Sequence, residues 1–467
     1  MSDPLRGSNR KWVYCAETVP GVTPTSPTTK YLRCLPSTSM KRATATLETK
    51  EVSNDRQKSL PRTGAVSASG QIDAELSPTT YDDFVCSALE CDAGDWTTPI
   101  TKTAATIAAA SVDNSFNDSG SGFLTAGFAQ GDIIIASGFS NAANNGIFIV
   151  SSAAAGKLIV AGLNALVTEA EGSSITIAKP KYMLPGSTMK TFTIAELLTD
   201  VIASGGCGFR SVGMAVDKWS VKVGTSGLVS STFSLAGRDQ YVTEQIVADT
   251  ISAAATDDSF NDSASGFNFQ PGDVVRVTGF TTGGNNSTFT VLTATAAKIT
   301  VDGALTDEAE GDDVVITTAV PLPGSAASTT TQFAGISNAN LANEGSVATA
   351  GLVTDFSVDM SNGLKTSYAI DSVGAASVGD DVFTLSGSIS IFVKDLAMVK
   401  KFVNETASSL DVTLEEPSGK SLRFFIPYIR YTGADRKGDA GDMMADMPFQ
   451  AGQSPVYGTT VVVISAG

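Results

Sequence analysis

The chain has 467 residues, of which 42% are hydrophobic, and its formal net charge is −17. Histidine is absent, which excludes Ser-His-Asp and Cys-His nucleophiles, HExxH metalloprotease sites and imidazole metal ligands. We therefore expect neither an enzyme nor a cofactor. No window reaches the roughly 18 consecutive apolar residues of a membrane helix, and the first residues lack the apolar stretch of a secretory signal. We expect a protein made in a cytosol.

Cysteine usage and residue mixture bear on the fold class. The five cysteines form no Cys-x-x-Cys pair, and their odd number argues against a disulfide framework. Cys86 lies in a predicted helix, where we interpret it as a buried thiol. Short runs rich in Val and Ile, separated by Gly, Ser and Thr, predict a mainly β chain.

The first hundred residues contain a charged stretch, a strand and a helix. The stretch from Pro36 to Arg62 is polar and mixed in charge, which is typical of a solvated loop. An alternating strand opens at Ser69-Gly70. Ser77 then predicts a helix N-cap, with proline at the first helical position. The residues that follow have the spacing of one apolar helix face: Tyr81, Phe84, Val85, Ala88 and Leu89.

Two later stretches are copies of one another. Residues 116–123 (FNDSGSGF) recur as 260–267 (FNDSASGF), and shared Gly-Asp, Asn-Asn and Glu-Ala-Glu-Gly motifs follow each copy. A repeat of this length indicates two related units, which we place at 104–180 (module 1) and 247–318 (module 2). Short strands separated by Asn- and Gly-rich turns predict small all-β modules. Module 1 has five acids against two bases and module 2 has eleven against two, so together they hold −12 of the net charge.

Both modules contain clusters of oxygen ligands. Asp113 and Asp118 in module 1 match Asp257 and Asp262 in module 2, and such clusters could suit Ca²⁺. Asx-turns explain the same residues without a metal, and we favour them. Each module also has two acids beside a glycine, which we interpret as solvated turn residues rather than an acid/base pair. These are Glu169, Glu171, Glu308 and Glu310.

Without the modules, a fainter duplication is visible. Ser386-Gly387 opens a strand that leads into a helix over 394–403, as Ser69-Gly70 does before the first helix. A strand that opens at Phe233 is similar to one that opens at Phe449, and Trp219 begins an alternating strand before the first of them. We predict two related halves, 1–103 with 181–246 and 319–467, each a β-sandwich with one packed helix.

Several short motifs occur in an informative order. They are 16–27 (AETVPGVTPTSP), 54–57 (NDRQ), 190–194 (KTFTI), 424–430 (FFIPYIR) and 447–451 (MPFQA). This order resembles the tail tube, or major tail, proteins of bacteriophages with long non-contractile tails. The resemblance covers the three segments outside the modules and neither module. It implies a β-sandwich with a packed helix, and subunits whose strands close a barrel around a channel.

The resemblance also implies partners and a location. Subunits would form rings that stack into a tube in the virion tail, after assembly in the host cytoplasm. The duplication favours three-subunit rings with pseudo-sixfold symmetry over hexamers. Tape measure, tail terminator and tail-tip proteins would be partners, and double-stranded DNA would pass through the lumen without specific binding. No membrane partner is implied.

Under this resemblance the charged stretch becomes an arm that contacts the next ring. Its candidate contact residues are Lys41, Arg42, Lys50, Glu51, Asp55, Arg56, Lys58 and Arg62. The modules, as insertions at loop tips, would project outward from the tube. The alternative is a surface-displayed, adhesin-like protein whose modules bind a host-surface ligand. The missing export signal disfavours a free adhesin but not one carried on a tail.

Overall fold

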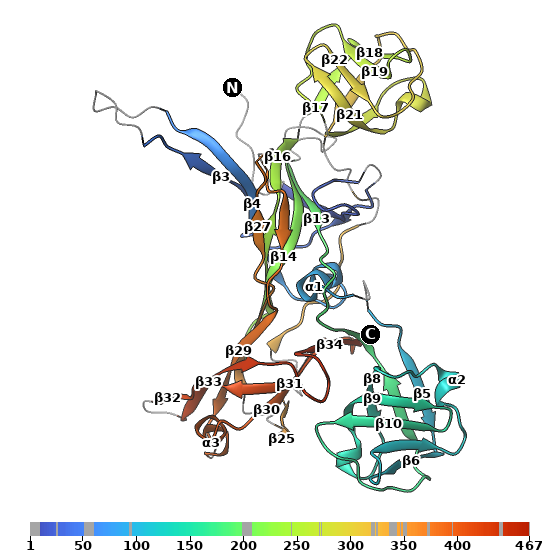
Figure 1. Cartoon of the computed structure of the whole chain (residues 1–467), viewed down its shortest axis with the longest axis vertical. Coiled ribbons are helices and arrows are strands. Elements are labelled where there is room, and N and C mark those ends of the chain that lie inside the picture. Colours follow the sequence, from blue (N-terminus) through green and yellow to red (C-terminus); the bar gives the residue numbers. More distant parts are fainter. Residues whose placement is uncertain are drawn as a thin grey trace.

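A computed structural model shows a long, mainly β body with two compact β modules beside it (Figure 1). It describes residues 10–24, 27–50, 60–92, 96–198, 208–243, 245–269, 271, 273–318, 323, 326–335, 343–345, 347–348, 353–370, 374–394, 396–438 and 442–466. The prediction of a mainly β chain is confirmed.

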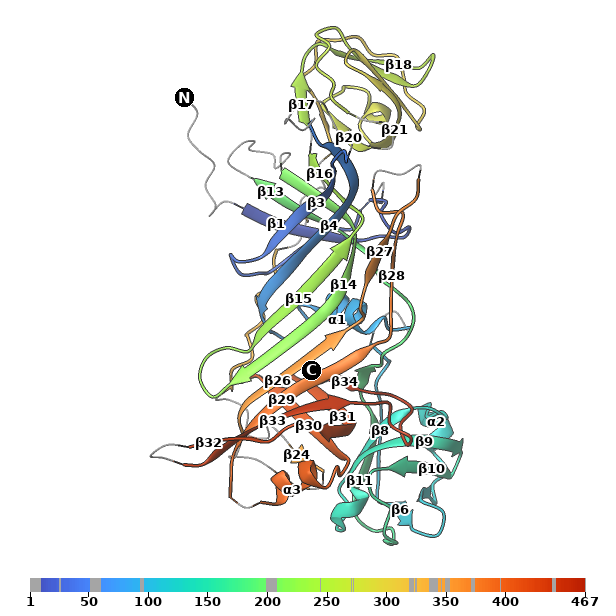
Figure 2. The same cartoon turned by 60° about the vertical axis from the view of Figure 1, so that its left-hand side comes forward.

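The body is one 18-stranded sheet system that runs through the length of the molecule (Figure 2). Its strands before residue 244 are β1 (Arg10–Ala16), β2 (Lys30–Tyr31), β3 (Ser39–Leu47), β4 (Arg62–Glu75), β12 (Lys181–Met183), β13 (Phe192–Leu198), β14 (Gly208–Gly224), β15 (Ser230–Gly237) and β16 (Asp239–Thr243). Those after it are β24 (Asn343–Glu344), β25 (Val347–Ala348), β26 (Val353–Ser361), β29 (Thr384–Phe392), β30 (Ser408–Glu415), β31 (Ser421–Tyr431), β32 (Asp435–Lys437), β33 (Met444–Ala451) and β34 (Val462–Ala466). A separate hairpin joins β27 (Lys365–Ser367) to β28 (Ser377–Gly379).

The modules are two seven-stranded sheets with the same strand order. The first contains β5 (Ile100–Ala104), β6 (Ile107–Ala110), β7 (Ser115–Asp118), β8 (Ile133–Ser137), β9 (Gly146–Ala154), β10 (Lys157–Gly162) and β11 (Ile175–Lys179) with α2 (Phe123–Ala126). The second contains β17 (Gln245–Ala248), β18 (Ile251–Ala254), β19 (Ser259–Asp262), β20 (Val274–Thr278), β21 (Thr288–Thr295), β22 (Lys298–Val301) and β23 (Val314–Thr317). Short 3₁₀ turns occupy matching places at η2 (Ala142–Asn144) and η3 (Gly283–Asn285). Each sheet encloses its own hydrophobic core, separate from that of the body.

Helix α1 (Asp82–Leu89) packs into the core of the body, and the predicted apolar face is buried. The predicted start of this helix at Ser77 is wrong. The Ser77 hydroxyl donates a hydrogen bond to Oγ1 of Thr80, and Thr79 has a φ of 62°. A left-handed residue cannot belong to a right-handed helix, so the helix begins only after this turn. The later helix α3 (Ala397–Val403) has no fully buried residue, although Met398 and Phe402 pack against the core.

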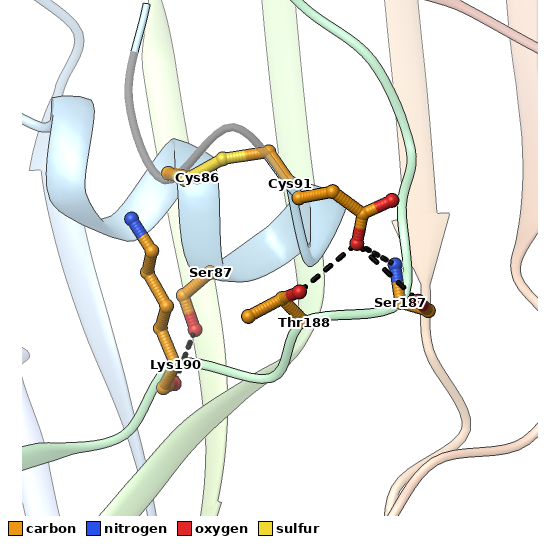
Figure 3. Close-up of a disulfide and its surroundings, with 7 residues drawn as sticks. Cys86, Ser87, Cys91, Ser187, Thr188 and Lys190 are labelled. Atoms are coloured by element: carbon orange, nitrogen blue, oxygen red, sulfur yellow. Dashed lines mark hydrogen bonds between the residues drawn. A yellow bond between two sulfur atoms is a disulfide. The ribbon is translucent and has the colours of Figure 1, made fainter. Parts of the chain in front are cut away.

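Cys86 and Cys91 form a disulfide at the end of α1 (Figure 3). The prediction of a thiol at Cys86 is therefore wrong, although its burial is confirmed. Glu90 adopts a left-handed conformation that turns the chain back on the helix, and this brings the two Cα atoms to 5.3 Å. An odd cysteine count could not reveal a local pair, because Cys15 and Cys34 remain free.

The disulfide is part of a wider attachment of α1. The carboxylate of Asp92 accepts hydrogen bonds from the backbone N–H of Ser187 (2.8 Å) and from the Thr188 hydroxyl (2.9 Å). The Ser87 hydroxyl donates to the carbonyl of Lys190 at 2.9 Å (Figure 3). The segment that returns from the first module is thus fixed to the end of the helix.

Candidate assembly interface

Strands β14 and β26 join the two sides of the body into one sheet. They pair antiparallel over seven residues, from Lys218 opposite Ser361 to Gly224 opposite Asp355. The predicted alternation of β14 is confirmed, because Trp219 is buried at this junction. The polar face carries charge, since Nζ of Lys218 lies 3.2 Å from the carboxylate of Asp359.

The same pattern of strand pairing occurs on both sides of this junction. We call β1, β3, β4, β13, β14, β15 and β16 the N-terminal group, and β24, β26, β29, β30, β31, β33 and β34 the C-terminal group. Taken in the order given, each strand of the N-terminal group has its counterpart at the same place in the C-terminal group. The pairings β1–β13, β3–β4, β4–β15, β13–β14, β14–β15 and β14–β16 recur as β24–β30, β26–β29, β29–β33, β30–β31, β31–β33 and β31–β34.

Shifts in strand register recur at corresponding places in the two strand groups. The register shifts between Phe192 and Ile194 in β13, and between Ser408 and Leu410 in β30. Because a bulge inserts one residue at a defined point of a ladder, matching bulges align two strand sets residue by residue. The two groups can therefore be compared position by position.

Among the open strand edges in the described part of the chain are those of β3, which pairs only with β4, and β32, which pairs only with β33. Lys41 on β3 lies opposite Ser69, as Asp359 on β26 lies opposite Ser386. Lys41 therefore holds the position that Asp359 has at the junction.

The open edge of β32 corresponds to the part of β14 that pairs with β26 at the junction. Asp435 pairs with Asp446 on β33, as Ser220 on β14 pairs with Thr232 on β15. The two partners correspond, because Asp446 pairs with Ser390 on β29 and Thr232 with Asp73 on β4. Lys41 and Asp435 are both exposed, and they carry opposite charges at the positions that correspond to the Asp359–Ser220 pair of the junction.

Exposed apolar side chains occur at the same end of the body as β32 (Figure 1). They lie at the end of β29, at the two ends of α3 and before β33: Phe392 (36% exposed), Leu396 (54%), Val403 (69%) and Met443 (48%). Open strand edges and exposed apolar groups are features that soluble proteins usually cover. This end of the body therefore has the character of a contact surface.

The charged stretch of the sequence forms the β3–β4 hairpin, which projects from the body (Figure 1). Lys41, Lys50 and Arg62 are exposed. Arg42 instead binds Asp239 on β16 with both ends of its guanidinium, at 2.8 and 3.3 Å, and this hydrogen bonding raises the pKa of Arg42. Four further candidates lie outside the described residues: Glu51, Asp55, Arg56 and Lys58.

Comparison with known families identifies this architecture. The family model described as phage tail tube protein matches residues 7–306 and again 287–451. The chain belongs to the phage tail tube protein family. A search of curated proteins finds no match. The family is structural, which implies a non-enzymatic role in the virion. In the described part of this tail tube protein, no helix has the length and apolar character needed to cross a membrane.

The repeated aspartates of the tail tube protein's modules bind backbone groups. The Asp118 carboxylate accepts hydrogen bonds from Thr106 Oγ1 (2.6 Å), Gly120 N (3.0 Å) and Gly122 N (2.8 Å), and Nζ of Lys102 lies 3.1 Å away. Burial raises the pKa of Asp118, but these hydrogen bonds outweigh it and hold that pKa at about 2.

Asp262 has the same role in the second sheet. It accepts hydrogen bonds from Thr250 Oγ1 (2.6 Å), Ala264 N (3.0 Å) and Gly266 N (2.6 Å). Asp113 and Asp257 each bond a serine two residues on, at 2.7 Å, and pair with a lysine. The described residues contain no group of three or more His, Cys, Asp or Glu placed to hold a metal. The calcium hypothesis thus gains no support from this arrangement.

The glutamates near the end of each module fix turns. Glu169 accepts hydrogen bonds from the backbone N–H of Ser140 (2.7 Å) and Asn141 (3.0 Å) and from Nδ2 of the buried Asn144 (3.0 Å). Glu308 does the same in the second sheet, and Glu171 and Glu310 each accept a serine hydroxyl. The interpretation as solvated turn residues is wrong for Glu169 and Glu308, which form isolated β-bridges with Ala109 and Ala253 and are half-buried.

Proposed function

We propose that this tail tube protein assembles into stacked rings that form the tail tube, the conduit for genome delivery. The β14–β26 junction carries the proposal, because it joins two strand groups with the same pairing pattern. We propose that they are tandem copies of one tube fold, 1–103 with 181–246 and 319–467. The modules, 104–180 and 247–318, would be insertions that project outward.

Ring closure would repeat the internal junction between molecules. In the same register, β32 of one subunit would pair with β3 of a second copy, which places Asp435 opposite Lys41 and Lys437 opposite Ser39. Directly opposed charges of unlike sign favour such a pairing. With two tube folds in each chain, three subunits would close a ring with pseudo-sixfold symmetry.

Stacking and the remaining partners follow the same proposal. The β3–β4 hairpin projects beyond the body, so its tip, with Lys50 and Arg62, would contact the next ring. Tape measure, tail terminator and tail-tip proteins would contact the ends and lumen of the tube. The modules hold −12 of the net charge of −17 and would project outward, so the total charge does not describe the lumen, through which we propose that double-stranded DNA passes without specific binding.

Electron microscopy of the purified protein tests this proposal. We expect rings or tubes from the natural chain, none from Lys41→Glu, and recovery when Lys41→Glu is combined with Asp435→Lys. Lys11→Glu is the matched control, because Lys11 is exposed on β1, away from both edges. A strictly monomeric protein that binds a host-surface glycan would contradict the proposal and support the adhesin alternative.

A further inference from the structure

The two modules lie at corresponding places on the body. The first lies beside β31 and β34, and the second beside β14 and β16 (Figure 1). On β31, Phe425 pairs with Asp411, one residue past the bulge position Leu410; on β14, Arg210 pairs with Ala195, one residue past Ile194. Phe425 and Arg210 thus hold the same position in the two strand groups.

The first module is attached through apolar contacts. Ile133 and Ile147, on β8 and β9, are buried in one cluster with Phe425, Val462 and Ile464 of the body. At the edge of this cluster the Tyr457 hydroxyl donates a hydrogen bond to the carbonyl of Ile147 at 2.5 Å. Burial of this face holds the module on its site.

The second module lacks that apolar face. Counted from the shared Gly-Asp motif, Ile133 becomes Val274 and Ile135 becomes Arg276, and Thr288 replaces Ile147. Arg276 is exposed, and neither Val274 nor Thr288 is fully buried. The contact that attaches the first module therefore cannot attach the second.

A cation is also placed differently in the two modules. In the first, Lys179 is the last residue of β11 and its Nζ lies 2.6 Å from the buried carboxylate of Asp132. In the second, the matching acid is Asp273, but the position of Lys179 is held by Thr318. The second module thus has a threonine where the first module has the lysine that pairs with this acid.

Arg210 of the body fills this place. Its Nη2 lies 3.6 Å from Oδ1 of Asp273, and its Nη1 donates a hydrogen bond to the carbonyl of Thr318 at 3.2 Å. The guanidinium carbon lies 5.6 Å from the centre of the Tyr241 ring, and Arg210 is only 5% exposed. A cavity of about 430 Å³, lined by Arg210, Tyr241 and Asp273 among others, adjoins this contact.

We propose that Arg210 holds the second module, which follows β16 after one residue, against the body by supplying the cation absent from the Lys179 position of that module, while Phe425 holds the first module beside β34. This uses the strand correspondence of the proposed tandem fold but does not require rings. On this site the first module would bring Asp132 already paired with Lys179, and so would set a second cation against the buried guanidinium, which strongly disfavours that module here. The modules would then alternate around a ring.

The test gives the second module its own lysine. Thr318→Lys lets Asp273 pair within the module and leaves Arg210 without its acid, so the module should leave its site. Spin labels at Leu292→Cys and Lys11→Cys, both at exposed positions, report the distance between module and body. We expect the distance distribution to broaden at least about twofold in Thr318→Lys and in Asp273→Asn.

Val247→Lys is the matched control, because it adds the same charge at an exposed position of the same module. Amide exchange in β19 and β22 shows whether the module stays folded in each variant. A narrow, unchanged distribution in both Thr318→Lys and Asp273→Asn would overturn the proposal. Equal broadening in Val247→Lys would overturn it too, since charge alone would then release the module.

Discussion

Replacing Asp118 by asparagine should destabilise the first module more than the matching change at Asp262 destabilises the second. The Asp118 side chain is fully buried and accepts three hydrogen bonds beside Lys102. An amide keeps one acceptor oxygen, but its NH₂ group then faces the Gly122 N–H and the Lys102 ammonium. Donor meets donor at both places.

The magnitude follows from those contacts. A hydrogen bond to a charged group contributes about 1.5–3 kcal/mol, and a buried charge that loses its partner adds to the loss. We therefore expect Asp118→Asn to lower the free energy of unfolding of the first module by about 4 kcal/mol. In the second module Ile246 lies against Gly266, where Lys102 lies against Gly122. Asp262→Asn removes no ion pair, so we expect it to lower the free energy of unfolding of the second module by about 2 kcal/mol.

Amide hydrogen exchange in the intact chain measures each module separately, through β6 and β7 for the first and β18 and β19 for the second. The control is Lys102→Ile combined with Asp118→Asn, which copies the second module and should bring the loss close to that of Asp262→Asn. Losses below about 0.5 kcal/mol in both asparagine variants would refute the reasoning, because surface carboxylates show such values.

The same carboxylate predicts a pH dependence, and three further outcomes follow elsewhere. Because the pKa of Asp118 is lowered to about 2, its stabilisation is present above about pH 4 and lost as the pH falls towards 2, which exchange against pH will show. Burial, aided by Asp380, raises the pKa of Glu90 to about 7, so the protein should become less stable as the pH rises from 4.5 through 7. The melting temperature should therefore fall between pH 5 and 8, and Glu90→Gln should abolish that fall. Replacing Cys86 and Cys91 by serine should cost about 2 kcal/mol in urea unfolding, as expected for a short closed loop, and an unchanged midpoint would refute this. Deletion of 247–318 should leave tubes visible by electron microscopy, and their loss would contradict an outward insertion.

Much of the fold could be predicted because local pattern and tertiary environment agree. Trp219 and its alternating neighbours are buried where β14 crosses the junction, and the apolar face around Phe84 packs into the core. The repeated motifs produced two sheets of the same strand order. Periodicity carries such information directly, because burial of one face sets it.

The remaining features depend on contacts between distant segments. The disulfide of Cys86 requires the left-handed turn at Glu90, which no cysteine count reveals. The similarity of Phe233 to Phe449 misplaced the closing strands by two residues, since Gly70 faces Leu235 whereas the corresponding Gly387 faces Phe449. Register is set by pairing along the whole strand, so two similar phenylalanines could not fix it.

The candidate interface was the least predictable part. Lys41 was predicted to contact the next ring, whereas we propose it for strand pairing within a ring. Asp435 was not predicted at all, because its short strand gains meaning only beside β33. Arg210 gave no signal in the sequence, since its partners Asp273 and Thr318 lie in another module. Both residues are identified only by comparing each with its counterpart in the other strand group, Asp435 with Ser220 and Arg210 with Phe425.

Disulfide cross-linking of assembled protein tests the tandem ring most directly. Residues directly opposed in an antiparallel pair have Cα atoms about 4.5–5.5 Å apart, within reach of a disulfide. A chain with Lys41→Cys and Asp435→Cys should therefore form covalent dimers and closed trimers on a denaturing, non-reducing gel, and nothing larger. Each single variant should stay monomeric. A ladder that continues to six subunits, or assembled tubes without any cross-link, would contradict the account.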